Sequence, residues 1–453
     1  MSAGCGAARD EPALAFGDPT EAGPLGPSCE RRDPGAGSPP SFHWSVDCHA
    51  EQPMSRPQVA VLGDGGIVVA FELGDTTSPA GAVTLDLGGG ALIGAGGSDV
   101  VVARFDAAGQ HVWSQLWGSE SMEGTSALTA LPDGGVALGL SFGGAVNVGG
   151  EVISPLAEYD ELLINLDAAG ELRWSRRWTP KRDGDWSVIT AVDSAADGSL
   201  VMAAHLSGEI ELVAGSLFVG DSSDTEVFAI FEADGALRRA EMRDVDVSAP
   251  ALGDDGSLVF ATPDGLQRIG RGGQPVWMLA GWRTPGAPDL DALVEPTRVM
   301  FAPNGDVVVA GAFSGTINFG GDDLVNPDFD VHRGNFDLFV ARFGADGSHR
   351  WSLRRDGPAP DSGRYQVVQA GRADETVLVY GVDTGPTYLE VFGLGGASLA
   401  ARTFSAGGAS GGGLMPDGTL VIAGASEAPI DLGGGPSGVL GEPQLWFGRV
   451  AVR

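Results

Sequence analysis

The stretch DLFVARFGADGSHRWS, residues 337–352, is repeated along the whole chain. It begins with a largely apolar run, turns at Asp346-Gly347, and ends in a short segment that contains Trp351. Asp-Gly adopts positive φ at low cost and therefore closes two antiparallel strands, so the stretch predicts a β-hairpin. Related hairpins are predicted at 99–114, 160–175, 226–240, 265–278 and 389–401.

A second hairpin precedes each of these copies. It is clearest in VMFAPNGDVVVAG (299–311), where two apolar strands flank an Asn-Gly turn. The turn residues along the chain are Asp64, Asp133, Asp197, Asp255, Asn304, Asp374 and Asp417. Two successive hairpins make a four-stranded antiparallel sheet with two apolar faces, and both faces become buried when such sheets stack around an axis.

The last copy is incomplete. The chain stops at QLWFGRVAVR (444–453), which matches DLFVARF but lacks the turn and the Trp-containing strand. The missing strand is present near the start of the chain as FHWSVDC (42–48). We therefore predict an all-β fold over residues 41–453: a seven-bladed β-propeller of four-stranded antiparallel blades, in which the strand at 42–48 completes the C-terminal blade. Rings of six or eight blades, or a split sandwich, are the alternatives.

The repeat resembles the seven-bladed β-propeller (SBBP) repeat family. The similarity is carried by DLFVARFGADGSHRWS and by the segment INFGG (317–321) that precedes it, with related segments such as LDLGGG (85–90) and VNVGGE (146–151). The resemblance implies a bacterial protein outside the cytoplasm, because many members are predicted lipoproteins. The family has no defined catalytic residues, so none is transferred to this chain.

Residues 1–40 are rich in Gly, Pro and charge and lack a strand period, which predicts a disordered linker. The start, Met-Ser-Ala-Gly-Cys5, resembles the end of a lipoprotein signal, so we expect lipidation of Cys5; an incidental Cys5 in a cytoplasmic protein is the alternative. In an oxidising compartment the remaining pair, Cys29 and Cys48, can form a disulfide, and two free thiols are the alternative.

Charge excludes two classes of partner. Acidic residues outnumber basic ones 60 to 27, which gives a net charge of −33. Nucleic acids and anionic membrane surfaces attract Lys and Arg, so we expect neither as a partner. No apolar run approaches the ~18 residues of a membrane-spanning helix, which leaves a lipid anchor as the expected membrane attachment.

Metal and catalytic signals are weak. The six His form no zinc-binding spacing, and no nucleophile elbow stands between a strand and a helix, so we expect no catalytic residues and no resident cofactor. The loop GGDDLVNPDFDVHRGNFD (320–337) contains four closely spaced carboxylates that could bind calcium, although its spacing is not that of an EF-hand. A solvated acidic loop is the simpler interpretation. The four residues are Asp322, Asp323, Asp328 and Asp330.

Eight of the ten Trp residues fall into two groups. Those at the repeated position are expected to pack between blades: Trp44, Trp113, Trp174, Trp277 and Trp351. Those just beyond that strand, Trp117, Trp178 and Trp282, lie nearer to loops and are the better ligand candidates.

The blade topology predicts that short Asp-Gly turns share one face and that long loops share the other. Because function usually resides on variable loops above a rigid scaffold, we expect partner contacts on the long-loop face. The expected function is that of a monomeric, non-catalytic binding or scaffold protein of the cell envelope, with a protein or glycan partner. A propeller-type enzyme, such as a quinone-dependent dehydrogenase or a lyase, and a purely structural envelope protein are the alternatives.

Overall fold

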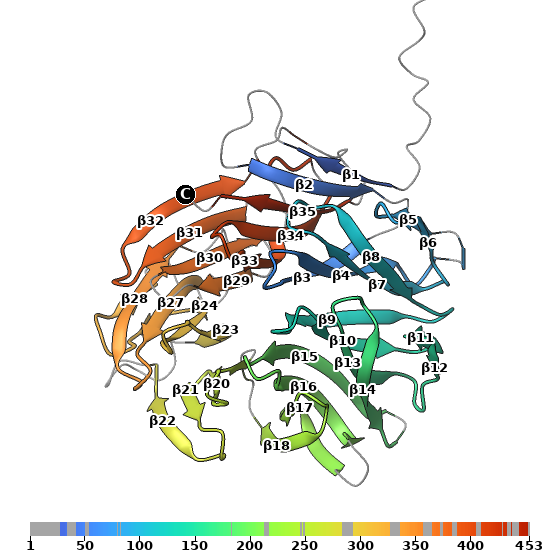
Figure 1. Cartoon of the computed structure of the whole chain (residues 1–453). Coiled ribbons are helices and arrows are strands. Elements are labelled where there is room, and N and C mark those ends of the chain that lie inside the picture. The colour runs from blue at the N-terminus through green and yellow to red at the C-terminus, as the bar shows by residue number, and fades with distance from the viewer. Residues whose placement is uncertain are drawn as a thin grey trace, which may run out of the picture.

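The protein consists of β-strands joined by turns and loops (Figure 1). The computed structural model describes residues 28–33, 42–49, 54–78, 80–81, 83–182, 184–212, 217–244, 247, 250–282, 293–326, 336–356, 365–371, 375–382, 387–404, 409–427, 429–432, 436 and 444–451. These residues contain no helix, and therefore none that is long and apolar enough to cross a membrane. The predicted fold class, all-β with antiparallel sheets, is confirmed.

The strands form seven successive groups of four, which we call blades 1 to 7, and pair in chain order within each blade. Blade 1 contains β3 (Met54–Val61), β4 (Ile67–Gly74), β7 (Ser98–Phe105) and β8 (His111–Trp117), and blade 2 contains β9 (Glu123–Ala130), β10 (Val136–Phe142), β13 (Asp160–Leu166) and β14 (Leu172–Pro180). Blade 3 contains β15 (Trp186–Ser194), β16 (Leu200–Glu211), β17 (Leu217–Phe231) and β18 (Leu237–Asp244). Blade 4 contains β19 (Ala251–Leu252), β20 (Leu258–Thr262), β21 (Gly265–Ile269) and β22 (Pro275–Ala280).

Blades 5 and 6 repeat this order, and blade 7 takes its fourth strand from the start of the chain. Blade 5 contains β23 (Val294–Phe301), β24 (Val307–Phe313), β27 (Asp337–Phe343) and β28 (His349–Arg355). Blade 6 contains β29 (Tyr365–Gly371), β30 (Glu375–Val382), β31 (Thr387–Gly393) and β32 (Ser398–Phe404). Blade 7 contains β33 (Ala409–Leu414), β34 (Leu420–Ser426), β35 (Gln444–Val450) and β2 (Phe42–His49).

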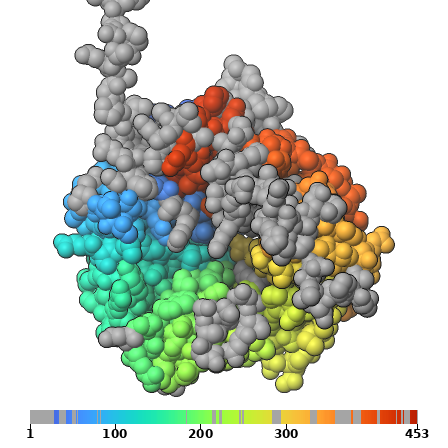
Figure 2. All heavy atoms as spheres, turned by 180° about the vertical axis from the view of Figure 1, so that it is seen from behind, coloured from blue at the N-terminus to red at the C-terminus, as the bar shows by residue number. Residues whose placement is uncertain are grey.

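The blades follow one another around a common centre (Figure 1). Their first strands contact each other in the order β3, β9, β15, β19, β23, β29 and β33, and β33 contacts β3. The predicted closing strand pairs as expected: β2 runs antiparallel to β35, from Phe42 opposite Val450 to His49 opposite Gln444. Segments from the two ends of the ring consequently lie side by side, blue beside red in Figure 2.

The prediction of an unstructured linker over residues 1–40 is wrong at its end. Residues Ser28–Arg32 form β1, which pairs with β2 and adds a fifth strand to blade 7. The sequence SCERR has no apolar alternation, and its pairing is instead fixed by Cys29, which lies opposite Cys48, and by the Arg31 Nε–H, which donates to the carbonyl of Ala108 at 2.9 Å.

Seven hydrophobic clusters hold the ring together, one between each pair of neighbouring blades. The cluster between blades 7 and 1 shows the pattern: Trp44 and Phe447 of blade 7 pack with Phe71 and Phe105 of blade 1. The apolar residues that alternate along the inner strands are thus shared between two interfaces, which is why strands such as β24 and β27 are buried on both faces.

At five interfaces, an insertion between the second and third strands fills the outer part of the space between two blades. We call this outer space the wedge and the inserted segment the plug. Each plug places two alternating apolar side chains in the cluster: Leu85 and Leu87, Val146 and Val148, Ile210 and Leu212, Ile317 and Phe319, and Ile430 and Leu432. The segments resembling INFGG in the sequence are these plugs.

The repeated Trp residues join each blade to the next, as predicted. Each indole N–H donates to a backbone carbonyl in the turn between the third and fourth strands of the following blade. The acceptors are Ala107 for Trp44 (3.2 Å), Ala168 for Trp113 (3.1 Å), Ala233 for Trp174 (3.0 Å), Ala345 for Trp277 (2.9 Å) and Leu394 for Trp351 (2.9 Å). We call this contact the tryptophan latch.

An arginine reinforces three of these latches. Arg449, Arg104 and Arg268 lie on third strands and donate to the same carbonyls as Trp44, Trp113 and Trp277. Each arginine also pairs with a predicted turn residue of its own blade, as Arg104 does with Asp64 (2.6 Å). Asp64 in turn accepts the Gly66 N–H at 2.8 Å, so it shapes the turn and orients the arginine at once.

The latch requires glycine at one position of the next turn. In blade 2, Gly170 has φ +85°, and a Cβ placed there would lie 3.1 Å from the indole ring of Trp113. The indole therefore rests against bare backbone, two residues beyond the carbonyl to which it donates.

This geometry predicts that Gly170→Ala destabilises the protein more than Gly150→Ala does. Gly150 lies on the plug of the same blade at the same φ of +85°, and a Cβ added there would have no atom within 4 Å. Both variants incur the cost of about 1–2 kcal/mol for a left-handed alanine. Gly170→Ala also overpacks against Trp113, which adds roughly 1–3 kcal/mol. Urea unfolding measures both changes, and equal losses would show that the indole contact contributes nothing.

Candidate functional site in the central cavity

A cavity of about 720 Å³ lies where the first strands of the blades meet. Blades 1, 2, 3 and 5 contribute strand residues such as Gln58, Ser126, Thr190 and Arg298. Residues of the short turns of blades 4 and 5, including Asp254 and Asn304, complete the lining. The described part of this cavity therefore reaches the short-turn face of the ring.

Asp193 and Arg298 are the charged pair of this cavity. The Asp193 carboxylate accepts the Leu252 N–H at 2.8 Å, which also ties blade 3 to blade 4. Burial raises the pKa of Asp193 to about 6, while the Leu252 hydrogen bond and the charge of Arg298 act in the opposite direction. The Asp193 carboxyl consequently changes charge close to neutral pH.

The Arg298 side chain is exposed, and the space that it faces is the cavity between the blades. Burial lowers the pKa of Arg298 from its ordinary value, and the charge of Asp193 opposes this effect. Among the residues that the structure describes, none forms a hydrogen bond or a close ion pair with the Arg298 guanidinium. Its five N–H groups are available to a ligand, and planar guanidinium groups bind carboxylates and phosphates in a bidentate manner.

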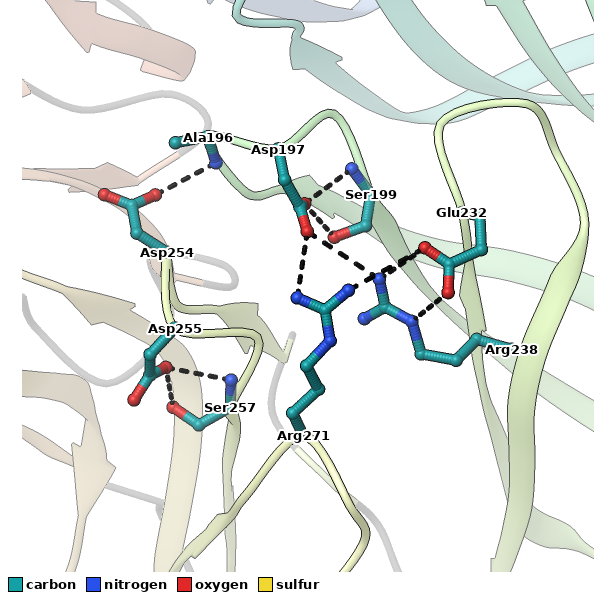
Figure 3. Close-up of polar contacts among 9 residues, drawn as sticks. All are labelled: Ala196, Asp197, Ser199, Glu232, Arg238, Asp254, Asp255, Ser257 and Arg271. Atoms are coloured by element: carbon teal, nitrogen blue, oxygen red, sulfur yellow. Dashed lines mark hydrogen bonds and ion pairs between the residues drawn. The ribbon is translucent and has the colours of Figure 1, made fainter.

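An ion-pair network stands beside the cavity on the short-turn face (Figure 3). Arg271 of blade 4 lies 3.2 Å from Asp197 and 4.0 Å from Glu232, both of blade 3, and Arg238 pairs with Glu232 at 2.6 Å. The turn of blade 3 is also held by Asp254, which accepts the Ala196 N–H at 3.0 Å.

The network occurs where the tryptophan latch is missing, because Arg239 replaces Trp on the fourth strand of blade 3. The hydrogen bond from Ser199 is the main cause that lowers the pKa of Asp197, and the hydrogen bond from Arg238 does the same for Glu232. Single exposed ion pairs contribute little to the stability of the folded protein, but a network of several charges can order a turn. The blade 3–4 junction is therefore joined by charges rather than by an indole.

The acidic loop at 320–337, predicted as a possible calcium site, lies only partly within the described residues. Asp323 accepts a hydrogen bond from the Asn318 amide at 2.7 Å, and Asp322 lies exposed beside it. Asp328 and Asp330 lie outside the described residues. In the part of the chain that the structure describes, no group of three or more His, Cys, Asp or Glu side chains could hold a metal ion. Calcium binding stays a prediction.

The three cysteines have separate outcomes. Cys29 and Cys48 are joined by a disulfide between β1 and β2. Cys5 lies outside the described residues, so its lipidation stays a prediction. Cys48 is fully buried in the cluster between blades 7 and 1, against the plug of blade 1.

The prediction that Trp117, Trp178 and Trp282 are ligand candidates is wrong. All three are at most 2% exposed, because the plugs of blades 2, 3 and 5 cover them. Trp282 illustrates this: its ring packs at 5.0 Å from Phe319, and its backbone carbonyl accepts the Asn318 N–H of the same plug. The sequence places these residues close to loops, but in the structure the plug of the following blade covers each of them.

Sequence reasoning missed Asp193 and Arg298, and also a group of buried acids. Asp99 and Glu161 stand near the starts of third strands, and burial raises their pKa values to about 7 and about 8. The pair Asp160-Glu161 carried a signal: side chains alternate along a strand, so one of two adjacent acids at its start faces inward. One oxygen of Glu161 has no hydrogen-bond partner.

No protein-family model matches the sequence, and no curated protein matches it. Among solved structures, the chain is similar to a protein of unknown function from Bacteroides caccae, at 11% identity and a TM-score of 0.34, over 66% of this chain and 81% of the other. It is also similar to the Dos1 propeller, at 13% identity and a TM-score of 0.39, over 68% of this chain and 67% of the other. With TM-scores this low, the fold is established from the strand pairing of this chain.

The buried acids predict that stability falls as the pH rises from about 5 to about 8. The unfolded chain releases the Glu161 proton near its ordinary pKa of 4.5, whereas the folded protein keeps it up to about 8. Asp99 and Asp193 act in the same direction over narrower ranges. Glu161→Gln should therefore reduce the pH slope of the free energy of unfolding and exceed the wild type in stability at pH 8.

Glu151→Gln is the matched control for this measurement. Glu151 lies exposed on the plug of the same blade, so its substitution should leave the slope unchanged. Chemical unfolding between pH 5 and 8 tests both variants. An unchanged slope in Glu161→Gln would show that Glu161 ionises normally in the folded protein.

Proposed function

We propose that this protein is a non-catalytic binding or scaffold β-propeller of the seven-bladed SBBP kind that acts outside the cytoplasm. The observation that carries the proposal is the cavity of about 720 Å³ at the centre of the ring. Its walls come from strands of several blades, so a ligand there would contact a scaffold fixed by latches, plugs and seven apolar clusters. Function on a rigid scaffold commonly uses such a position.

The chemistry of the cavity favours a polar ligand. The lining combines the guanidinium groups of Arg268 and Arg298, carboxylates and the side-chain amides of Gln58 and Asn304. The Ser126 hydroxyl donates to the Ile189 carbonyl, which leaves its oxygen able to accept a further hydrogen bond. A glycan or a polar protein segment fits this set better than an apolar molecule does.

The long-loop face stays part of the proposal as a second contact surface. Much of it, including 283–292, 327–335 and 357–364, lies outside the described residues. The described residues favour the short-turn mouth of the cavity as the entry point, because Asp254 and Asn304 belong to the short turns.

The location of the protein is proposed from the cysteines. A disulfide such as Cys29–Cys48 persists in oxidising compartments and is rare in the cytosol. Acylation of Cys5 would place a lipid anchor 23 residues before Ser28 of β1, the first described residue. The intervening Gly- and Pro-rich segment would act as a tether between the membrane and the ring.

A second candidate, a propeller-type enzyme, is favoured by one observation. Asp193 has a raised pKa and faces a cavity that also contains Arg298, whose guanidinium has no hydrogen-bond partner among the described residues; this is the combination expected of a general acid or base beside an electrostatic anchor. Turnover that depends on Asp193, in screens with and without calcium and a quinone acceptor, would favour this candidate over a binding protein.

Ligand binding is tested with a glycan array and the full-length chain. We expect a bound glycan whose signal falls at least tenfold in Arg298→Gln, because the Arg298 guanidinium lines the cavity and has no hydrogen-bond partner among the described residues. Arg350→Gln, an exposed arginine on the fourth strand of blade 5, should bind as the wild type does. A ligand that Arg298→Gln retains would place the site elsewhere, and an array without binding would contradict glycan recognition.

Location is tested in native cells with the natural upstream DNA. We expect the wild type in the detergent-extracted membrane fraction and Cys5→Ser in the soluble fraction. In the unfolded protein, Cys29 and Cys48 should react with a maleimide only after reduction, because the disulfide blocks both thiols. A soluble wild type with two reactive thiols would place the protein in the cytoplasm.

A further inference from the structure

In the part of the chain that the structure describes, two of the seven wedges have no plug. In blade 4 the second and third strands are joined by residues 263–264, and in blade 6 by residues 383–386. These links are too short for the hairpins or extensions that form the other plugs. The clusters between blades 3 and 4 and between blades 5 and 6 accordingly contain no residue of such an insertion.

The residue type at one position of the fourth strand depends on whether the next blade has a plug. Four residues after the latch position, a buried residue stands wherever the next blade has a plug, as Trp117, Trp178, Phe404 and Cys48 do; in blade 4 the corresponding residue is Trp282, one position later. Arg243 and Arg355 occupy this position where the next blade has no plug. Both arginines stack on a Phe of that blade, at 5.5 Å from Phe260 and 5.1 Å from Phe392.

The two unplugged wedges differ in how their charges are satisfied. Arg355 is bound by both oxygens of Glu390, at 2.6 and 2.5 Å. In the wedge between blades 3 and 4, by contrast, Arg239 and Arg243 share the single carboxylate of Glu241, at 2.6 and 3.2 Å. The Nη1 of Arg239 and the Nε of Arg243 are buried without an acceptor. Among the described side chains, this wedge therefore has one more positive than negative charge, in a protein of net charge −33.

The facing surface of blade 4 is apolar and open. Met278 on the outer strand is 64% exposed. Ser114, Ser175 and Ser352 hold the equivalent positions in blades 1, 2 and 5, and they are half-buried where a plug is present. A methionine is thus exposed at a position where serines are covered, which is the reverse of the usual preference.

From these observations we propose that the wedge between blades 3 and 4 binds a segment of a partner protein that acts as a plug supplied in trans. The five plugs of this chain define its chemistry: two apolar residues separated by one residue, followed in most cases by a glycine turn. The guanidinium nitrogens without an acceptor indicate that the segment also has a carboxylate. Three of the internal plugs have one, because the residue between their two apolar residues is Asp86, Glu211 or Asp431.

The proposed contacts follow from the geometry of the internal plugs. In blade 1, Leu85 and Leu87 enter the apolar cluster, and Gly88 and Gly89 pass against His111 on the outer strand. An equivalent segment in the open wedge would run between Arg239 and Arg243 on β18 and Met278 on β22. It would cover the methionine and bring its carboxylate to the arginines. This surface is separate from the central cavity, so the inference does not depend on the proposed function.

The test uses a peptide copied from the plug of blade 1, VTLDLGGGALIGA (residues 83–95), labelled with fluorescein. Fluorescence anisotropy should show saturable binding to the full-length protein. Met278→Asp and Arg243→Gln should each weaken binding at least tenfold, because one removes the apolar contact and the other a cation. A peptide with Leu85→Ser and Leu87→Ser should bind at least tenfold more weakly.

Val112→Asp is the matched control, since Val112 is exposed on the outer strand of blade 1, whose wedge is already filled. It should bind the peptide as the wild type does, and Arg298→Gln should do the same. Thermal unfolding of each variant shows that the ring remains folded. Absence of saturable binding, or equal binding by Met278→Asp and wild type, would overturn the proposal. An equal loss in Val112→Asp would overturn it too, because binding would then not be specific to this wedge.

Discussion

The ring depends on the close approach of an indole to the backbone of the next blade. A tryptophan at the outer strand donates to a carbonyl such as Ala168 and lies against a glycine such as Gly170. The indole N–H supplies this part-buried carbonyl with a donor, so the latch satisfies the turn at the same time as it joins two blades. Everything nearer the centre, including the lining of the cavity, is held in place by five repetitions of this contact and by the charge network at the blade 3–4 junction.

The second constraint is geometric. Flat sheets arranged around an axis diverge towards the outside, so apolar faces that touch near the centre separate at the rim. The plugs fill this space with two apolar side chains each, and the buried Trp117 and Trp178 lie beneath them. Where no plug is present, the side chains of Arg243 and Arg355 stack on a phenylalanine of the next blade. Each arginine covers the aromatic side chain while its charged group stays near water.

The architecture was accessible from the sequence because its signals are local and repeated. Alternating apolar residues and Asp-Gly turns predict the hairpins, and the missing last strand predicts the pairing of residues 42–48 with 444–450. The site was less accessible. Asp193 and Arg298 meet only after several blades have assembled, and no spacing along the chain records that meeting. Trp117 was misjudged for a related reason, since its burial depends on an insertion that folds back from the next blade. β1 was missed because its pairing rests on one cysteine and two arginines rather than on an apolar pattern.

The position of β2 has a consequence for synthesis. Its residues are synthesised before all seven blades, whereas its neighbour β35 is the last strand of the ring to be made. Until then, β2 has no third strand to pair with, and the outer edge of the final blade cannot form. Blades 1 to 6 can assemble as the nascent chain emerges, but the circle is sealed only once β35 has left the ribosome, so a ribosome stalled before β35 would leave an open arc with an unpaired edge.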